Sequence, residues 1–167
     1  KGWTEKEKTT ILYDSTTSLF TRESFFQAIR KEPNVAVIGF TGDGDVFGFF
    51  YDKAIVDEDQ PYKRRKPFVF TLESRGRSER PQRFDVRDSA KYIVDYWMQK
   101  EGQPCGFVYL RCGTGGFGLG NEKTETWCRS LSVGFDGLDD DLLTGKDREP
   151  YLCVRLVAVQ FSELNIV

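Results

Sequence analysis

The chain has 167 residues, among them 14 Phe, seven Tyr and three Trp, which suffice for the core of one folded domain. Its formal net charge of −2 argues against a uniformly basic, nucleic-acid-binding surface. The absence of His removes the commonest general base and zinc ligand, so serine–histidine and cysteine–histidine hydrolases are excluded.

The ends and cysteines of the chain indicate its setting. It opens without an initiator Met or an apolar signal stretch, so we read it as part of a longer protein. We assign residues 1–10 to an extension or linker and residues 11–167 to one domain. No apolar run approaches the roughly 18 residues of a membrane span. The cysteines lack C-x-x-C spacing, which favours reduced thiols in a cytoplasmic or nuclear protein over zinc or disulfides. They are Cys105, Cys112, Cys128 and Cys153.

A helix is predicted after a short apolar run at residues 11–13 and a polar stretch at 14–18. Thr21 can cap its first turn, where Glu23 suits the helix dipole. Apolar side chains follow at helical spacing, and Pro33 ends the segment. The apolar residues of this face are Phe25, Phe26 and Ile29.

Strands dominate the rest of the chain. Residues 35–40 and 46–51 flank turn-forming residues 41–45 and predict a hairpin whose strands are buried on both faces. Residues 68–72 form a third strand, and residues 92–98 fit either a helix or a strand.

The C-terminal half continues this pattern. Residues 107–112 form a strand that runs into a glycine-rich element, and residues 136–150 form an exposed acidic loop. Residues 152–161 form a long strand that we expect to be central in its sheet. The pattern predicts a mainly β (α+β) fold, in which two antiparallel sheets form a sandwich flanked by one or two helices.

No cofactor, metal or catalytic site is predicted. The glycine-rich residues 113–120 lack the Gly-Lys-Ser/Thr ending of a P-loop and the βαβ setting of a dinucleotide site, so a structural role is favoured. Residues 41–45 and 136–141 lack calcium-loop spacing. Catalysis by a pair of carboxylates stays open, but nothing selects a pair among the 26 acidic residues.

Two basic loops are the candidate partner-binding region. Positive charge is concentrated between residues 63 and 87, where Arg80, Arg83 and Arg87 add to the candidate binding residues named below. These side chains either form a solvated surface or bind an acidic protein surface, nucleic acid or anionic lipid. The candidate binding residues are Lys63, Arg64, Arg65, Lys66, Arg75 and Arg77.

The order of five motifs resembles the TLDc domain of the oxidation-resistance proteins. The motifs occupy residues 12–16, 43–48, 68–72, 115–119 and 151–161, and the second reads D-G-D-V-F-G. Gly120 stands where the family often has Trp. The residues that carry the resemblance as structural positions are Gly48, Gly115, Gly116, Phe117, Gly118 and Leu119.

The resemblance implies a β-sandwich, a connection with oxidative-stress protection and, in several members, binding to the vacuolar proton-pumping ATPase. It implies no catalytic residue. We therefore expect a non-catalytic interaction module of a larger regulatory or oxidative-stress-response protein. Two rival hypotheses remain: a nucleic-acid-binding regulatory domain that uses residues 63–87, and a cysteine-based redox protein.

Overall fold

The computed structural model describes residues 8–57, 62–63, 67–90, 94–98, 106–113, 115–120, 126–145 and 150–162. Within these residues, the strands form two antiparallel six-stranded sheets. In spatial order, sheet I consists of β1 (Lys8–Asp14), β12 (Cys153–Ser162), β2 (Val35–Thr41), β3 (Val46–Tyr51), β5 (Phe68–Glu73) and β6 (Gln82–Asp85). Sheet II consists of β11 (Pro150–Tyr151), β10 (Thr126–Arg129), β9 (Gly115–Leu119), β8 (Val108–Cys112), β7 (Val94–Met98) and β4 (Tyr62–Lys63).

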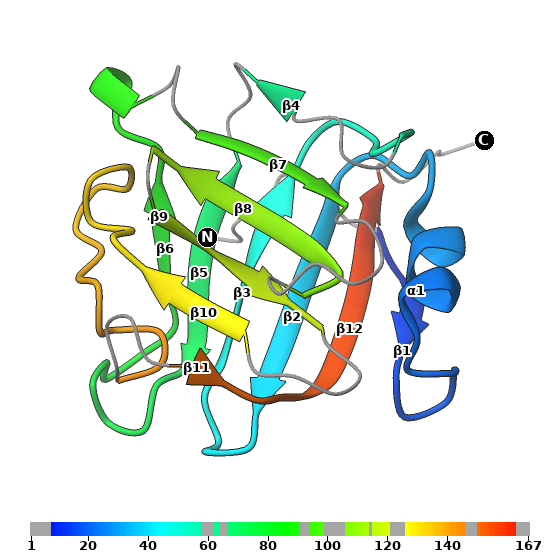
Figure 1. Cartoon of the computed structure of the whole chain (residues 1–167), viewed down its shortest axis with the longest axis horizontal. Coiled ribbons are helices and arrows are strands. Elements are labelled where there is room, and N and C mark those ends of the chain that lie inside the picture. Colours follow the sequence, from blue (N-terminus) through cyan, green and yellow to red (C-terminus); the bar gives the residue numbers. More distant parts are fainter. Residues whose placement is uncertain are drawn as a thin grey trace.

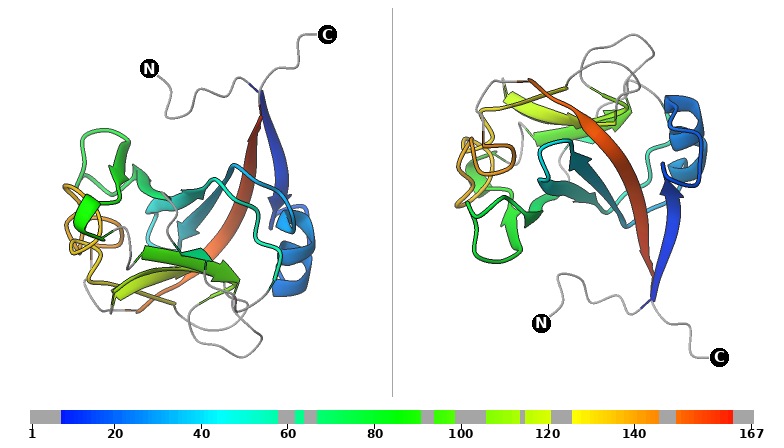
Figure 2. Two further views of the ribbon diagram at one scale, coloured as in Figure 1. Left: turned by 90° about the horizontal axis from the view of Figure 1, so that it is seen from above. Right: turned by 90° about the horizontal axis from the view of Figure 1, so that it is seen from below.

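The two sheets pack face to face (Figure 1). Figure 2 shows the two layers from above and below, with helix α1 (Arg22–Ile29) beside β1 at one side of the sandwich. A short 3₁₀ helix, η1, covers Asp88–Ala90. The predicted mainly β sandwich is confirmed, and α1 is the single α-helix of the described residues.

Helix α1 follows the sequence pattern closely. The Ser24 amide donates to Thr21 Oγ1 over 3.2 Å, so Thr21 is the N-cap. Phe25 and Ile29 are fully buried, and the Phe25 ring meets that of Tyr13 edge-on at 5.2 Å. The predicted apolar face of the helix is thus buried, and it ties β1 to the core.

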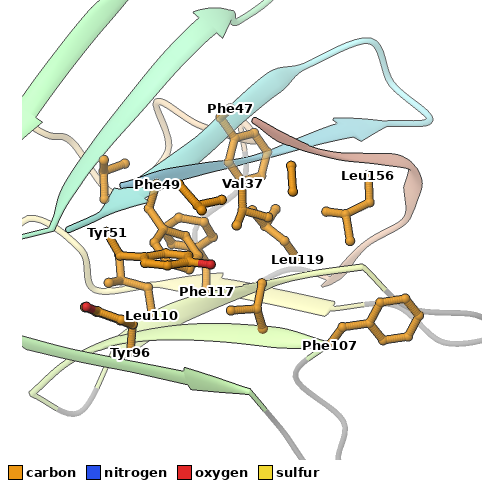
Figure 3. Packing of buried hydrophobic residues seen from close by; sticks show 14 of the residues in the cluster. Val37, Phe47, Phe49, Tyr51, Tyr96, Phe107, Leu110, Phe117, Leu119 and Leu156 are labelled. Carbon is orange, nitrogen blue, oxygen red and sulfur yellow. The ribbon is translucent and has the colours of Figure 1, made fainter. Parts of the chain in front are cut away.

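Aromatic side chains from both sheets interlock in the core (Figure 3). Phe47 and Phe49 of sheet I meet Phe117 of sheet II, with ring centroids 5.6 and 5.8 Å apart. Tyr51 stacks on Tyr96 at 5.2 Å. Each fully buried aromatic side chain stabilises the fold by about 1.5–3 kcal/mol relative to an exposed one, so these contacts hold the layers together.

The outer face of sheet I carries a second apolar cluster. Ala36, Phe68 and Phe70 are buried there, with Ile38 and Phe50 partly buried against them. Residues 35–41 and 46–51 therefore have apolar neighbours on both faces, in line with their unbroken apolar sequence.

Some segments differ from the sequence prediction, and one segment that fitted either a helix or a strand is now assigned. Residues 94–98 form a strand. β1 begins at Lys8. β12 lies between β1 and β2 and is thus an interior strand. The segment predicted as an exposed acidic loop buries Leu138 and Leu143, which anchor it to the core.

Candidate functional site

Three loops meet at one end of the sandwich. They are residues 42–45 between β2 and β3, residues 74–81 between β5 and β6, and residues 131–145 after β10, and together they form what we call the loop platform. They lie toward the lower left of Figure 1, where the 131–145 segment runs beside β6. Binding surfaces commonly form from loops that a rigid scaffold holds in place.

Arg77 joins all three loops. Its Nη2 lies 2.5 Å from Asp45 Oδ1, and it also donates to the carbonyl oxygen of Leu143 over 3.2 Å. Its Nε donates to the carbonyl oxygen of Leu142 over 3.1 Å. The Asp45 side chain is 2% exposed, so the guanidinium neutralises a carboxylate that would otherwise be buried alone. The arginine fork can satisfy several acceptors at once, which a lysine could not do in this geometry.

Arg87 holds the other part of the 131–145 segment. Its Nε donates to the carbonyl oxygen of Phe135 over 3.1 Å and lies 3.2 Å from Asp136 Oδ1. Its backbone amide donates to the carbonyl oxygen of Gly134 over 2.9 Å. Arg77 and Arg87 therefore fix this segment at two separate points.

The surface of the loop platform carries charges of both signs. Arg75 and Arg80 are exposed in the loop between β5 and β6. Asp139 and Asp141 are exposed on the 131–145 segment, whereas Asp140 accepts the backbone amide of Ser132 over 2.7 Å. This arrangement offers salt-bridge partners to another protein and places acidic groups on the same platform as the arginines.

The structure does not gather the described members of the predicted basic region into one patch. Arg75 is exposed, whereas Arg77 is occupied by contacts within the fold. Arg83 lies 3.9 Å from the centroid of the Phe68 ring and pairs with Asp85 at 2.6 Å. Lys63 is placed only by its backbone, in β4 at the edge of sheet II. The predicted residues Arg64, Arg65 and Lys66 lie outside the described residues.

The glycine-rich motif forms a strand inside sheet II. Residues 115–119 are β9, and Phe117 and Leu119 are fully buried. Gly115 pairs with Cys112 in the β8–β9 hairpin, and the Gly118 carbonyl oxygen accepts the Tyr151 hydroxyl. All five residues of β9 are buried, and the strand lies between β8 and β10.

Two further glycines of the resemblance lie where a side chain would clash. A Cβ on Gly116, whose φ is 150°, would lie 2.3 Å from the carbonyl oxygen of Leu110. A Cβ on Gly48 would lie 1.9 Å from the carbonyl oxygen of Val37 and 2.9 Å from the Phe70 ring. Both positions thus require glycine for close packing.

The described cysteines lie inside the fold. Cys128 and Cys153 are buried, and burial raises the pKa of the Cys153 thiol. The Cys153 Sγ donates to the carbonyl oxygen of Arg155 over 3.2 Å. A buried, protonated thiol is a poor nucleophile. Cys105 lies outside the described residues, and of Cys112 only the backbone is placed.

Sequence reasoning missed a second long-range ion pair, between Asp14 and Arg155. Arg155 Nη2 lies 2.5 Å from Asp14 Oδ2, and its Nε donates to Asp14 Oδ1 over 3.1 Å. The Arg155 hydrogen bond, helped by the Thr16 amide, holds the pKa of Asp14 well below its ordinary value. The partners are 141 residues apart in sequence, and no local pattern links them.

Comparison with known proteins identifies the family of this chain. No helix among the described residues is long and apolar enough to cross a membrane. A search of curated proteins found no match. The family model of the TLDc domain matches residues 2–145, which include both sheets' central hairpins and the glycine-rich strand. The chain therefore belongs to the TLDc domain family.

Proposed function

We propose that this TLDc domain is a non-catalytic interaction module of a larger regulatory or oxidative-stress-response protein, and that the loop platform is its recognition surface. The Arg77 contact carries the proposal, because it fixes loops from three parts of the chain in one arrangement. A preorganised surface loses little conformational entropy on binding, which favours specific recognition.

The mixed charge of the platform favours a protein partner over nucleic acid. Phosphate backbones are bound by clustered Lys and Arg, and nearby carboxylates weaken such binding. On the platform, Asp139 and Asp141 are exposed together with Arg75 and Arg80. The family resemblance suggests the vacuolar proton-pumping ATPase as the first partner to test.

Binding of the purified domain to the isolated peripheral sector of that ATPase tests the proposal. We expect the double charge reversals Arg75→Glu/Arg80→Glu and Asp139→Lys/Asp141→Lys each to weaken binding at least tenfold, about 1.4 kcal/mol. Glu23→Lys is the matched control, because this exposed side chain lies on α1, outside the platform. If Glu23→Lys weakens binding as much as the platform variants do, the loop platform is not the recognition surface.

A parallel titration with duplex DNA separates the nucleic-acid rival. We expect weak binding that disappears near about 0.15 M salt, since counterion release governs a non-specific contact. Tight, sequence-selective binding at that salt concentration would refute the interaction-module proposal and favour a nucleic-acid-binding domain.

A further inference from the structure

The first half of β1 is an exposed sheet edge. β1 pairs with β12 on one side and is the terminal strand of sheet I in the described part of the chain. Both views of Figure 2 show β1 and β12 extending together beyond the body of the sandwich, with α1 beside the other end of β1. Lys8, Thr9 and Thr10 are exposed, and Ile11 is 66% exposed. Such an edge is a template for another strand.

The register shows which backbone groups the edge presents. The Phe161 amide donates to the carbonyl oxygen of Asn34, so the backbone of Phe161 faces β2 and away from β1. Thr9 pairs with Phe161 and Ile11 pairs with Val159. Because hydrogen-bonded and non-hydrogen-bonded pairs alternate in an antiparallel ladder, Thr9 and Ile11 both turn their N–H and C=O groups outward.

The side chains of the same residues extend the apolar outer face of sheet I. Ile11 lies opposite Val159, Val159 opposite Ala36, and Ala36 opposite Phe50, so all of them share one face. That face carries the second apolar cluster, whose partly buried members include Phe161. Ile11 is thus the exposed end of an apolar row that stops at the edge of the sheet.

We propose that this edge pairs with a second copy of the same chain, β1 against β1 and antiparallel, about a two-fold axis at Thr10. The axis places Thr9 of one copy opposite Ile11 of the other, and both residues present outward backbone groups, so each pair exchanges two hydrogen bonds. The edge is therefore complementary to itself in this register. The two Thr10 residues form the central non-hydrogen-bonded pair, a favourable cross-strand combination.

The pairing also continues the apolar rows from one copy into the other. Thr9 lies opposite Phe161 within its own sheet, so Ile11 of one copy is brought beside the Thr9 and Phe161 of the other. The exposed Ile11 side chain loses contact with water, worth about 25 cal/mol for each Å² of apolar surface buried. The result is one continuous sheet made from sheet I of two copies.

Sedimentation velocity over a range of protein concentrations gives the first test. We expect the mass to rise from monomer to dimer, and Ile11→Lys to weaken association at least tenfold. Leu19→Lys is the control, because Leu19 is 75% exposed but lies outside β1. A protein that stays monomeric, or a dimer that Ile11→Lys leaves intact, would overturn the proposal.

Cysteine cross-linking tests the register. The axis puts the two Thr10 Cα atoms about 4.5 Å apart, within the range of a disulfide, so Thr10→Cys should yield a covalent dimer under mild oxidation. Lys8→Cys should not, because its two copies lie about 14 Å apart along the strands. The parent protein reports any background from its native cysteines. Cross-linking through Lys8→Cys but not Thr10→Cys would refute this register.

Hydrogen exchange distinguishes a second copy of the chain from a different protein as the strand that pairs with the β1 edge. The amides of Thr9 and Ile11 should gain protection as the protein concentration rises. If they are protected only when a different protein is added, the edge belongs to a foreign strand and the self-pairing proposal is wrong. Because the platform and this edge lie on different elements, loss of one function leaves the other testable.

Discussion

Removal of the Arg77 side chain should destabilise the domain more than any change at an exposed arginine. In Arg77→Met, the Asp45 carboxylate stays buried without its partner, and the carbonyl groups of Leu142 and Leu143 lose their donors. Breaking a buried ion pair by removing one partner typically costs 3–5 kcal/mol. Because the Arg77 side chain is 26% exposed, we expect the lower end of this range, about 3 kcal/mol.

Urea unfolding followed by fluorescence measures this loss, which corresponds to a melting temperature lowered by roughly 6–12 °C for a domain of this size. The matched control is Arg80→Ala in the same loop, whose exposed side chain should contribute less than about 0.5 kcal/mol. A second change, Asp45→Asn in the Arg77→Met background, should recover about 1–2 kcal/mol by removing the unpaired charge. Equal losses in Arg77→Met and Arg80→Ala, or strictly additive effects at Arg77 and Asp45, would refute the reasoning.

Three further predictions concern other parts of the fold. Since its pKa is lowered in the folded state, Asp14 should contribute stability above its ordinary pKa of 3.8 and lose that contribution as the pH falls further. The difference in unfolding free energy between the parent and Asp14→Asn should therefore shrink below about pH 4, and a constant difference would contradict the pairing with Arg155. Gly48→Ala should lower the free energy of unfolding by about 1–3 kcal/mol, because the added Cβ overpacks the site. In the control Gly42→Ala the added Cβ meets only Val154, at 3.6 Å, so its effect should be nearly neutral, and equal thermal melting curves for the two variants would count against the clash. Cys128 and Cys153 should react with a thiol reagent only as urea unfolds the protein, and rapid labelling of either residue in the native state, followed by mass spectrometry, would show an accessible thiol instead.

Local sequence patterns were sufficient for the elements that depend on neighbouring residues. The helix after Thr21 was predictable because its cap and its apolar spacing lie within nine residues. The hairpin around residues 41–45 was predictable because turn-forming residues separate two apolar runs. Residues 92–98 remained ambiguous from the sequence, since the strand at residues 94–98 depends on pairing with β8, which lies ten or more residues away. Tertiary pairing decides such cases.

The Asp45–Arg77 and Asp14–Arg155 pairs could not be predicted in the same way. Their partners are 32 and 141 residues apart, and each pair forms only after strands distant in sequence have come together. Asp45 stands in a turn-forming stretch and therefore reads as an ordinary exposed turn residue. Its carboxylate instead pairs with Arg77, which also donates to the carbonyl oxygens of Leu142 and Leu143 in the 131–145 segment.

The arginines of the basic region differ in whether their charge is available to a partner. A count of positive charges treats every arginine as available to a partner, but loops that pack against one another leave carbonyl groups and a buried carboxylate that need donors. Arg77 and Arg87 donate to these groups, so their guanidinium groups form contacts within the fold. In the proposed recognition, binding depends on the exposed charges of the platform, which include the carboxylates of Asp139 and Asp141 as well as the guanidinium groups of Arg75 and Arg80. Such a surface favours a partner that presents both acidic and basic groups, as a protein does, over a phosphate backbone.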